Sequence, residues 1–188
     1  NRIYLYNAAE NSWKPLTGED LDVSSFALDP TGSQAVVIAA PYKGKRELEN
    51  QLYLLDLKSG SLSLLASPEH FRYYFADFLN DKMVICAGSD GVPYGLNQNP
   101  LFYTVDLVSK EQSLITPGLD LSIGSSVGSD CRFGHSKALK VSGGCLYFTS
   151  TEGGHSYLNR LEPNGQITRL NSAPGSVDGL RCTTTRCF

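Results

Sequence analysis

Apolar residues alternate with polar ones in short runs along this chain, and one such pattern recurs. Residues 51–65 read as an apolar strand that ends at Asp56, a turn over Lys58-Ser59-Gly60, and a second short apolar strand. Apolar runs that flank a glycine-containing turn predict a β-hairpin. Similar hairpins start near Tyr4, Tyr103 and Tyr157, and the tyrosines at 4, 53, 103 and 157 are spaced at about 50 residues, near the period of a kelch-type propeller blade.

The stretches before the hairpins predict two further strands in each repeat. Residues 23–28, a turn at Asp29-Pro30-Thr31-Gly32 and the apolar run 35–40 precede the second hairpin, and residues 73–78 and 83–87 precede the third. Four strands per unit are typical of a β-propeller blade. We therefore predict an all-β fold, a β-propeller fragment with four-stranded antiparallel blades. The expected units are a half blade at 1–17, blades at 18–67 and 68–117, a blade with an insertion at 118–172, and the start of a further blade or an irregular tail at 173–188.

Composition excludes several functional classes. The chain has 188 residues and a formal net charge of -3, without the basic stretch expected of a nucleic-acid-binding protein. No run approaches the roughly 18 apolar residues of a membrane span. Five cysteines without paired C-x-x-C spacing indicate neither a zinc site nor a complete disulfide framework, and favour reduced thiols in the cytoplasm. Because the sequence opens inside a strand without a start methionine, we expect a fragment.

One segment resembles a known family. Residues 122–134, Ser-Ile-Gly-Ser-Ser-Val-Gly-Ser-Asp-Cys-Arg-Phe-Gly, together with repeats ending Leu16-Thr17 and Ile115-Thr116, resemble the propeller of prolyl-oligopeptidase-family serine peptidases, particularly the acylaminoacyl-peptidase-like branch. The resemblance covers nearly the whole chain up to about Gly179. It implies a non-catalytic propeller that gates the access of peptide substrates to a C-terminal α/β-hydrolase domain, with no cofactor. A stand-alone protein-binding propeller of the kelch or TolB type is the alternative, because fold alone does not separate the two.

A nucleophile motif is present but lacks its context. Gly124-Ser125-Ser126-Val127-Gly128 satisfies G-x-S-x-G, which requires a preceding strand and a following helix. The next residues contain two glycines without helical periodicity, and the acid and histidine candidates Asp130, Asp178, His135 and His155 are spaced too closely or in the wrong order for a triad. We therefore expect no catalytic residue and no peptidase activity.

Five side chains are candidates for the lining of a substrate channel: Arg72, Tyr73, Tyr74, Arg132 and His135. The three residues from 72 to 74 lie on an expected inner strand, although aromatic residues at period two are also typical of packing between blades. Arg132 and His135 lie in the insertion, Leu119 to Ser136, which we expect to leave the blade surface and cover one end of the propeller. Asp56 and Asp106 occupy matching positions in two repeats and are expected to cap turns. No metal site is indicated.

The expected strand count is two, four, four, four and at most one, which leaves an open arc. Such an arc would expose the apolar walls of its end blades, with residues such as Ile3, Leu5, Leu158 and Leu170. Exposed apolar walls of that kind mark interaction surfaces. We therefore expect self-association through the open blade walls.

Overall fold

The computed structural model describes residues 1–45, 47–93, 95–127, 138–177 and 179–182, and every regular element except one 3-10 helix is a β-strand. The first half of the chain holds β1 (Tyr4–Asn7), β2 (Ser12–Pro15), β3 (Leu21–Leu28), β4 (Gln34–Pro41), β5 (Gln51–Asp56), β6 (Leu62–Ala66), β7 (Phe71–Phe78) and β8 (Met83–Asp90). The second half holds η1 (Gly95–Asn97), β9 (Leu101–Asp106), β10 (Gln112–Leu114), β11 (Ser122–Ile123), β12 (Leu139–Ser142), β13 (Cys145–Glu152), β14 (His155–Leu161) and β15 (Ile167–Arg169).

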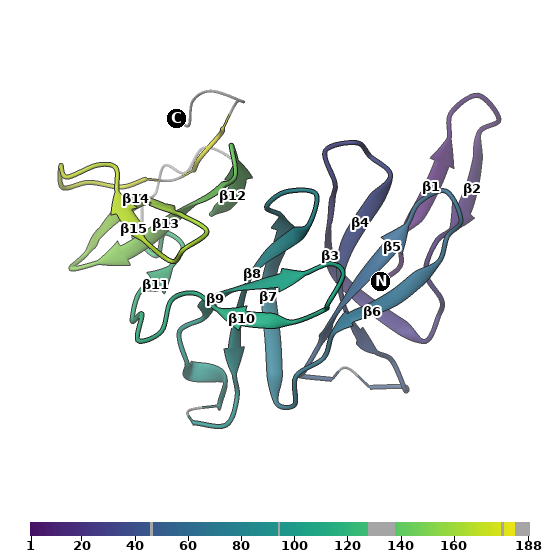
Figure 1. Cartoon of the computed structure of the whole chain (residues 1–188), viewed down its shortest axis with the longest axis horizontal. Coiled ribbons are helices and arrows are strands. Elements are labelled where there is room, and N and C mark those ends of the chain that lie inside the picture. The colour runs from purple at the N-terminus through teal and green to yellow at the C-terminus, as the bar shows by residue number, and fades with distance from the viewer. Residues whose placement is uncertain (46, 94, 128–137, 178, 183–188) are drawn as a thin grey trace.

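The strands form three large antiparallel sheets and one hairpin, which follow one another across the molecule (Figure 1). The first sheet has the order β3-β4-β5-β6, and the second has the order β10-β9-β8-β7. In the third sheet, β13 pairs with both β11 and β12 on one side and with β14 on the other, and β15 follows β14. The expected all-β architecture with four-stranded antiparallel blades is confirmed. Ser122–Ile123, part of the insertion that was expected to leave the blade surface, is instead a short strand, β11, of the third sheet.

The second strand of each of the first two sheets is buried because neighbouring elements pack on both of its faces. In β4, the side chains of Val36 and Ile38 belong to the apolar cluster shared with the second sheet, whereas Ala35, Val37 and Ala39 belong to the cluster on the opposite face. All five side chains are at most 1% exposed. Burial of apolar surface stabilises the fold by about 25 cal/mol per Å². Apolar residues on both faces of one strand therefore hold adjacent sheets together.

The Leu-Thr and Ile-Thr repeat endings have a structural cause. The hydroxyl of Thr17 accepts a hydrogen bond from the backbone N–H of Ile3 at 3.0 Å, and that of Thr116 accepts one from Phe102 at 2.9 Å. Both threonines are 5% exposed. A buried N–H without an acceptor is costly, so in these two hairpins a threonine hydroxyl accepts the N–H that would otherwise lack its next ladder bond.

The third sheet shows that the fourth tyrosine is not the equivalent of the other three. Ala87 pairs with Phe102, and the corresponding residue Thr149 pairs with Leu158. Asn159, not Tyr157, is thus the equivalent of Tyr103. Asn171 confirms this register, because its side-chain oxygen accepts the N–H of Leu158 at 2.7 Å, as Thr116 does for Phe102.

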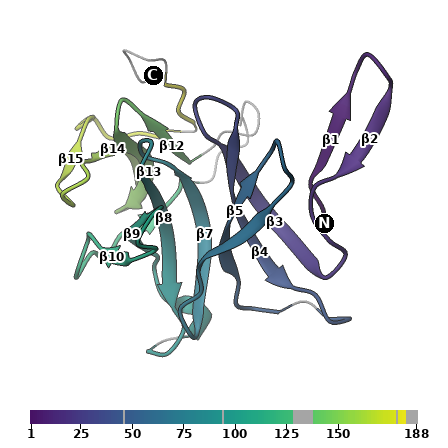
Figure 2. The ribbon, with the colours of Figure 1, turned by 45° about the vertical axis from the view of Figure 1, so that its right-hand side comes forward.

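The connections divide the molecule into two ends. The longer connections, 42–50 and 91–100, lie at one end, and the tight turns between the inner strands of the first two sheets lie at the other (Figure 1). The hairpin β1–β2 projects away from the three sheets (Figure 2). Of the wall residues expected to be exposed, Leu5 and Leu170 are 48% and 45% exposed, but Ile3 is 7% exposed because it packs in the cluster of Leu16 and Val23.

Candidate functional site

The innermost strand of every sheet is interrupted at the same point. The register shifts between Val23 and Ser25 in β3, and between Tyr73 and Phe75 in β7, so one residue bulges out of each strand. In the third sheet, Ile123 still pairs with Ser150, but the pairing resumes only at Leu139. The insertion therefore replaces the single bulged residue of the other two sheets. Bulges often re-aim a side chain at a functional site.

Two hollows lie along the inner strands on either side of the bulged Tyr74, and we call them together the inner groove. The first, about 170 Å³, lies between β3 and β7, and its polar lining includes Asp22, Ser24, Glu47, Asn50 and Arg72. The second, about 250 Å³, extends from β3 across β7 to β12 and includes Phe26, Asp77 and Lys140. Because Tyr74 lines both hollows, its side chain stands in the middle of the inner groove.

Arg72 and Tyr74 form a cation–aromatic pair in this groove. The Arg72 guanidinium carbon lies 5.4 Å from the centre of the Tyr74 ring, and the Tyr74 hydroxyl is hydrogen-bonded to that of Ser89 at 3.0 Å. The ring remains 43% exposed. Among the ion pairs of the described residues none involves Arg72, whereas Asp22 pairs with the chain's amino group and Glu47 with Lys45. Within the described residues, the Arg72 guanidinium therefore stacks on the ring and forms no ion pair, although the carboxylates of Asp22 and Glu47 line the same hollow.

Tyr73 borders the first hollow, but its side chain is buried between the sheets, unlike that of Tyr74. Its side chain is 2% exposed, its ring lies 4.7 Å from that of Phe71, and its hydroxyl donates to the Gln112 side chain. Burial raises the pKa of the Tyr73 hydroxyl far above its usual value. Adjacent residues of a strand point to opposite faces, and a bulge redirects the side chain that it contains. Tyr73 therefore packs between sheets, while Tyr74 faces the inner groove.

Asn50 fixes this arrangement. Its side-chain oxygen accepts the backbone N–H of Tyr73 at 2.7 Å, and its side-chain nitrogen donates to the Tyr73 carbonyl at 2.9 Å. The amide thus acts as a strand partner at the point where the bulge interrupts the ladder. Sequence reasoning missed Asn50 and Ser89, because each acts through a contact more than ten residues away and neither stands in a local motif.

The insertion is fastened to β13 at its base. Gly124 N–H donates to the Thr149 carbonyl at 2.7 Å, and Thr149 N–H donates to the Ala138 carbonyl at 2.9 Å, so Thr149 joins a residue within the insertion to one just after it. The Thr151 hydroxyl donates to the Gly124 carbonyl and accepts the Ser126 N–H, both at 2.9 Å. The candidates Arg132 and His135, like Asp130, lie outside the described residues.

Ser126 does not have the setting of a catalytic serine. The strand before it, β11, belongs to an antiparallel sheet. The backbone N–H of Ser126 donates a hydrogen bond to the Thr151 hydroxyl. The part of the chain that the structure describes contains no α-helix that could follow a nucleophile elbow. His155 lies at the start of β14 opposite Glu152, beside the ring of Tyr157. Asp178, the remaining acid candidate, is outside the described residues.

The paired aspartates cap turns, as expected. The Asp56 carboxylate accepts the N–H and hydroxyl of Ser59, each at 2.7 Å, and the Asp106 carboxylate accepts the N–H groups of Val108 and Ser109, each at 2.8 Å. These hydrogen bonds favour the charged form and lower the pKa of both carboxyls. The two residues therefore have a structural explanation and do not form a carboxylate dyad.

The cysteines differ from the expectation of reduced thiols. Cys86 and Cys145 are free, and burial raises the pKa of the Cys86 thiol far above its usual value, but Cys182 is disulfide-bonded. Among the described residues no group of three His, Cys, Asp or Glu side chains could hold a metal ion. No described helix is long and apolar enough to cross a membrane.

Comparison with known proteins identifies the fold. No family model and no curated relative matches the sequence. The fold matches that of TolB from Acinetobacter baumannii (18% identity, TM-score 0.59, 95% of this chain and 39% of that one). It also matches a prolyl endopeptidase (16%, 0.61, 90% and 23%) and the β-propeller domain of the Trilobed protease from Pyrococcus furiosus (13%, 0.59, 94% and 50%).

The chain has a β-propeller fold. It spans half or less of each of these three structures. At identities below 20%, the likeness shows the architecture alone, and both peptidases and TolB carry it.

Proposed function

We propose that this chain is the non-catalytic propeller portion of a serine oligopeptidase of the acylaminoacyl-peptidase type, and that it gates peptide access to an α/β-hydrolase domain. The peptide passes the inner groove, where Arg72 and Tyr74 contact it. The observation that carries this proposal is the Arg72–Tyr74 pair, an oriented cation without a carboxylate partner among the described residues, in a groove lined by the innermost strands.

The chemistry of the inner groove favours a peptide. Serine hydroxyls, the Asn50 amide and the carboxylates of Asp22 and Glu47 line its first hollow beside Arg72, and apolar residues such as Phe75 and Leu139 line its second. The guanidinium of Arg72 can form two parallel hydrogen bonds with a carboxylate, either the C-terminus of a short peptide or an acidic side chain. A groove of this kind binds flexible chains and not folded proteins.

A protein-binding propeller of the TolB kind is the second candidate, supported by the likeness to TolB. In that case a folded partner binds the exposed loop surface, and short peptides leave the inner groove unoccupied. The two functions therefore predict different ligands at Arg72.

Nuclear magnetic resonance titration of the labelled chain tests the first proposal. The probe is an N-acetylated hexapeptide with a free carboxylate, and its C-terminal amide is the matched ligand. We expect the free acid to perturb the amide signals of Arg72, Tyr74 and Ser89, and Arg72→Met to weaken its binding about tenfold, because a hydrogen bond to a charged group contributes about 1.5–3 kcal/mol.

Arg169→Met is the control, because this arginine also stacks on a tyrosine, Tyr157, but is paired with Glu152 outside the inner groove. Equal binding of the free acid and the amide, or equal losses in the two arginine variants, would contradict the assignment of Arg72.

A further inference from the structure

A third hollow, of about 330 Å³, lies beside the start of β7, between the connections 42–50 and 91–100, and we call it the end pocket. Its lining includes Leu48, Glu49, His70, Phe71, Arg72 and Val92. Sites for small ligands have volumes from about 300 Å³ and combine apolar walls with a few polar groups. The end pocket has both properties, whereas each hollow of the inner groove is smaller.

The apolar part of the end pocket has a fixed floor and two exposed walls. The floor is Phe71, which is 4% exposed and whose ring lies 4.7 Å from that of Tyr73. Gly88 on β8 makes room for this ring, because a Cβ atom there would lie 2.3 Å from a ring carbon. The walls are Leu48 and Val92, which are 62% and 68% exposed. An apolar group that enters the pocket therefore covers exposed apolar surface while the floor stays in place.

His70 ties both connections to the start of β7. Its φ is 54°, a left-handed conformation that is uncommon for residues other than glycine. The His70 carbonyl accepts the N–H of Gly91 at 2.6 Å, and its Nδ1 lies 3.1 Å from Glu49 Oε1. One contact reaches the connection 91–100 and the other reaches the connection 42–50. The rim of the end pocket is therefore held together by hydrogen bonds, and the carboxylate of Glu49 has a partner.

Arg72 joins the end pocket to the inner groove, because it lines both the end pocket and the first hollow. None of the ion pairs formed by the described residues involves it. The carboxylates of Asp22 and Glu47 line the first hollow but not the end pocket, where the carboxylate of Glu49 is paired with His70. Of the two hollows, the end pocket is therefore the more favourable place for an anionic group at Arg72.

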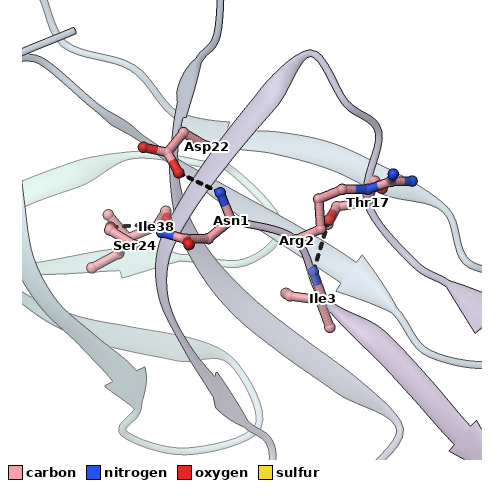
Figure 3. A network of polar contacts seen from close by, with 7 residues as sticks. All are labelled: Asn1, Arg2, Ile3, Thr17, Asp22, Ser24 and Ile38. Carbon is pink, nitrogen blue, oxygen red and sulfur yellow. Dashed lines mark hydrogen bonds and ion pairs between the residues drawn. The ribbon is translucent and has the colours of Figure 1, made fainter. Parts of the chain in front are cut away.

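The first sheet lacks this combination at the equivalent positions. The bulges align β3 with β7, and the residues of the first sheet that correspond to Phe71, Arg72, Tyr74 and Gly88 are Leu21, Asp22, Ser24 and Ala39. The bulged Ser24 donates its hydroxyl to the Ile38 carbonyl of its own sheet at 3.1 Å, so no ring stands there (Figure 3). A blade forms with either set of residues. The architecture therefore does not require the cation, the aromatic floor and the glycine of the second sheet, whereas a ligand would explain all three.

We propose that the end pocket binds the C-terminal residue of a peptide, with its carboxylate on Arg72 and an apolar side chain between Leu48, Phe71 and Val92. This inference rests on the proposed function and specifies its substrates as peptides that end in an apolar residue. A C-terminal residue carries its carboxylate and its side chain on one Cα atom, so its site needs a cation directly beside an apolar hollow. Arg72 and the floor residue Phe71 are neighbours in the chain and line one pocket. The rest of the peptide lies in the inner groove, which begins at the same arginine.

Two isomeric peptides test this inference by nuclear magnetic resonance titration of the labelled chain. Both are N-acetylated hexapeptides of glycine, serine and one leucine with a free carboxylate; the leucine is the last residue in one and the third residue in the other. We expect the peptide that ends in leucine to bind about tenfold more tightly, which corresponds to 1.4 kcal/mol, because its side chain is buried in the end pocket. The amide signals of Phe71 and Gly91 should shift with this isomer and not with the other.

Val92→Ser supplies the matching variant of the protein. Val92 is exposed and lies on a connection, so the change is compatible with folding, which the amide spectrum of the variant verifies. We expect the preference for the peptide that ends in leucine to fall below about threefold, because the wall loses apolar surface. Val108→Ser is the control, since this valine is also exposed but lies in the turn between β9 and β10, and the tenfold preference should remain.

The outcomes separate this inference from the proposed function on which it rests. Equal binding of the two isomers, with weaker binding of both C-terminal amides, would overturn the inference and leave the proposed function standing. Binding that does not depend on the carboxylate, or no binding of either isomer, would contradict both. An equal loss of preference in the two valine variants would place the leucine side chain outside the end pocket.

Discussion

The inner strands of the second and third sheets are interrupted at the same point of the backbone ladder, but by different numbers of residues. In β7, one residue, Tyr74, bulges out, and the side chain of Asn50 bonds to the backbone of Tyr73 beside it. Between β11, which ends at Ile123, and β12, which begins at Leu139, the pairing with β13 is interrupted; Thr149 of β13 is hydrogen-bonded to Gly124 and Ala138, and Thr151 is hydrogen-bonded to Gly124. The backbone pairing on either side is the same.

This difference shows that residues can be added at the bulge, and so alter the inner surface of a propeller sheet, at little cost in backbone pairing. The ladder before and after the interruption is kept, and only the residues between are free to vary. In the second sheet the bulge presents a single ring to the inner groove, and in the third it gives rise to a long insertion. We therefore expect the residues that close the interruption to contribute to stability, and the residues outside the ladder to contribute little.

The largest expected effect is that of Tyr73→Ala. Truncation of a buried aromatic side chain leaves a cavity and costs about 3–5 kcal/mol. The free energy of unfolding is measured by urea denaturation. Tyr74→Ala is the matched control, because the neighbouring ring is partly exposed and faces the inner groove; we expect a loss below about 1 kcal/mol. Similar losses for the two tyrosines would mean that they do not differ in packing.

Asn50→Ala comes next. It leaves the N–H and C=O of Tyr73 without their side-chain partners, and a buried group that loses its hydrogen bond costs about 1–3 kcal/mol. Asn99→Ala, which removes only an exposed bond to Asp120, should cost less than about 0.5 kcal/mol by the same urea measurement. Hydrogen exchange at the Tyr73 amide should accelerate only in the first variant. Unchanged exchange at that amide would show that Asn50 does not close the bulge.

Thr151→Val should have the smallest effect of the three. The isosteric change removes the hydroxyl that joins Gly124 and Ser126, and a hydrogen bond of this kind contributes about 1 kcal/mol. Faster amide exchange at Ser126, with unchanged exchange along β14, is the specific readout. Thr151→Ser keeps the hydroxyl and should restore the slow exchange; failure to do so would assign the effect to packing of the methyl group.

The architecture could be predicted from the sequence because the residues that indicate a β-hairpin lie close together in the chain. Alternation of apolar residues, the Asp56 and Asp106 turns and the Leu-Thr endings lie within a few residues of one another, and the repetition of the unit adds independent examples of the same pattern. Even so, sequence alignment matched Tyr157 to the other tyrosines, where the structure has Asn159, because an apolar pattern of period two permits a shift by two residues without a change of face.

The tertiary structure alone decided which side chains form the candidate site. Tyr73 and Tyr74 are identical residues side by side on opposite faces of β7, and only the packing of the first sheet against β7 determines that Tyr73 is the buried one. Ile3 is likewise buried by residues brought together by folding, while Tyr6, three positions later, is exposed. Local sequence sets the period of a strand, but exposure depends on which sheet lies against it, and that contact joins residues many positions apart.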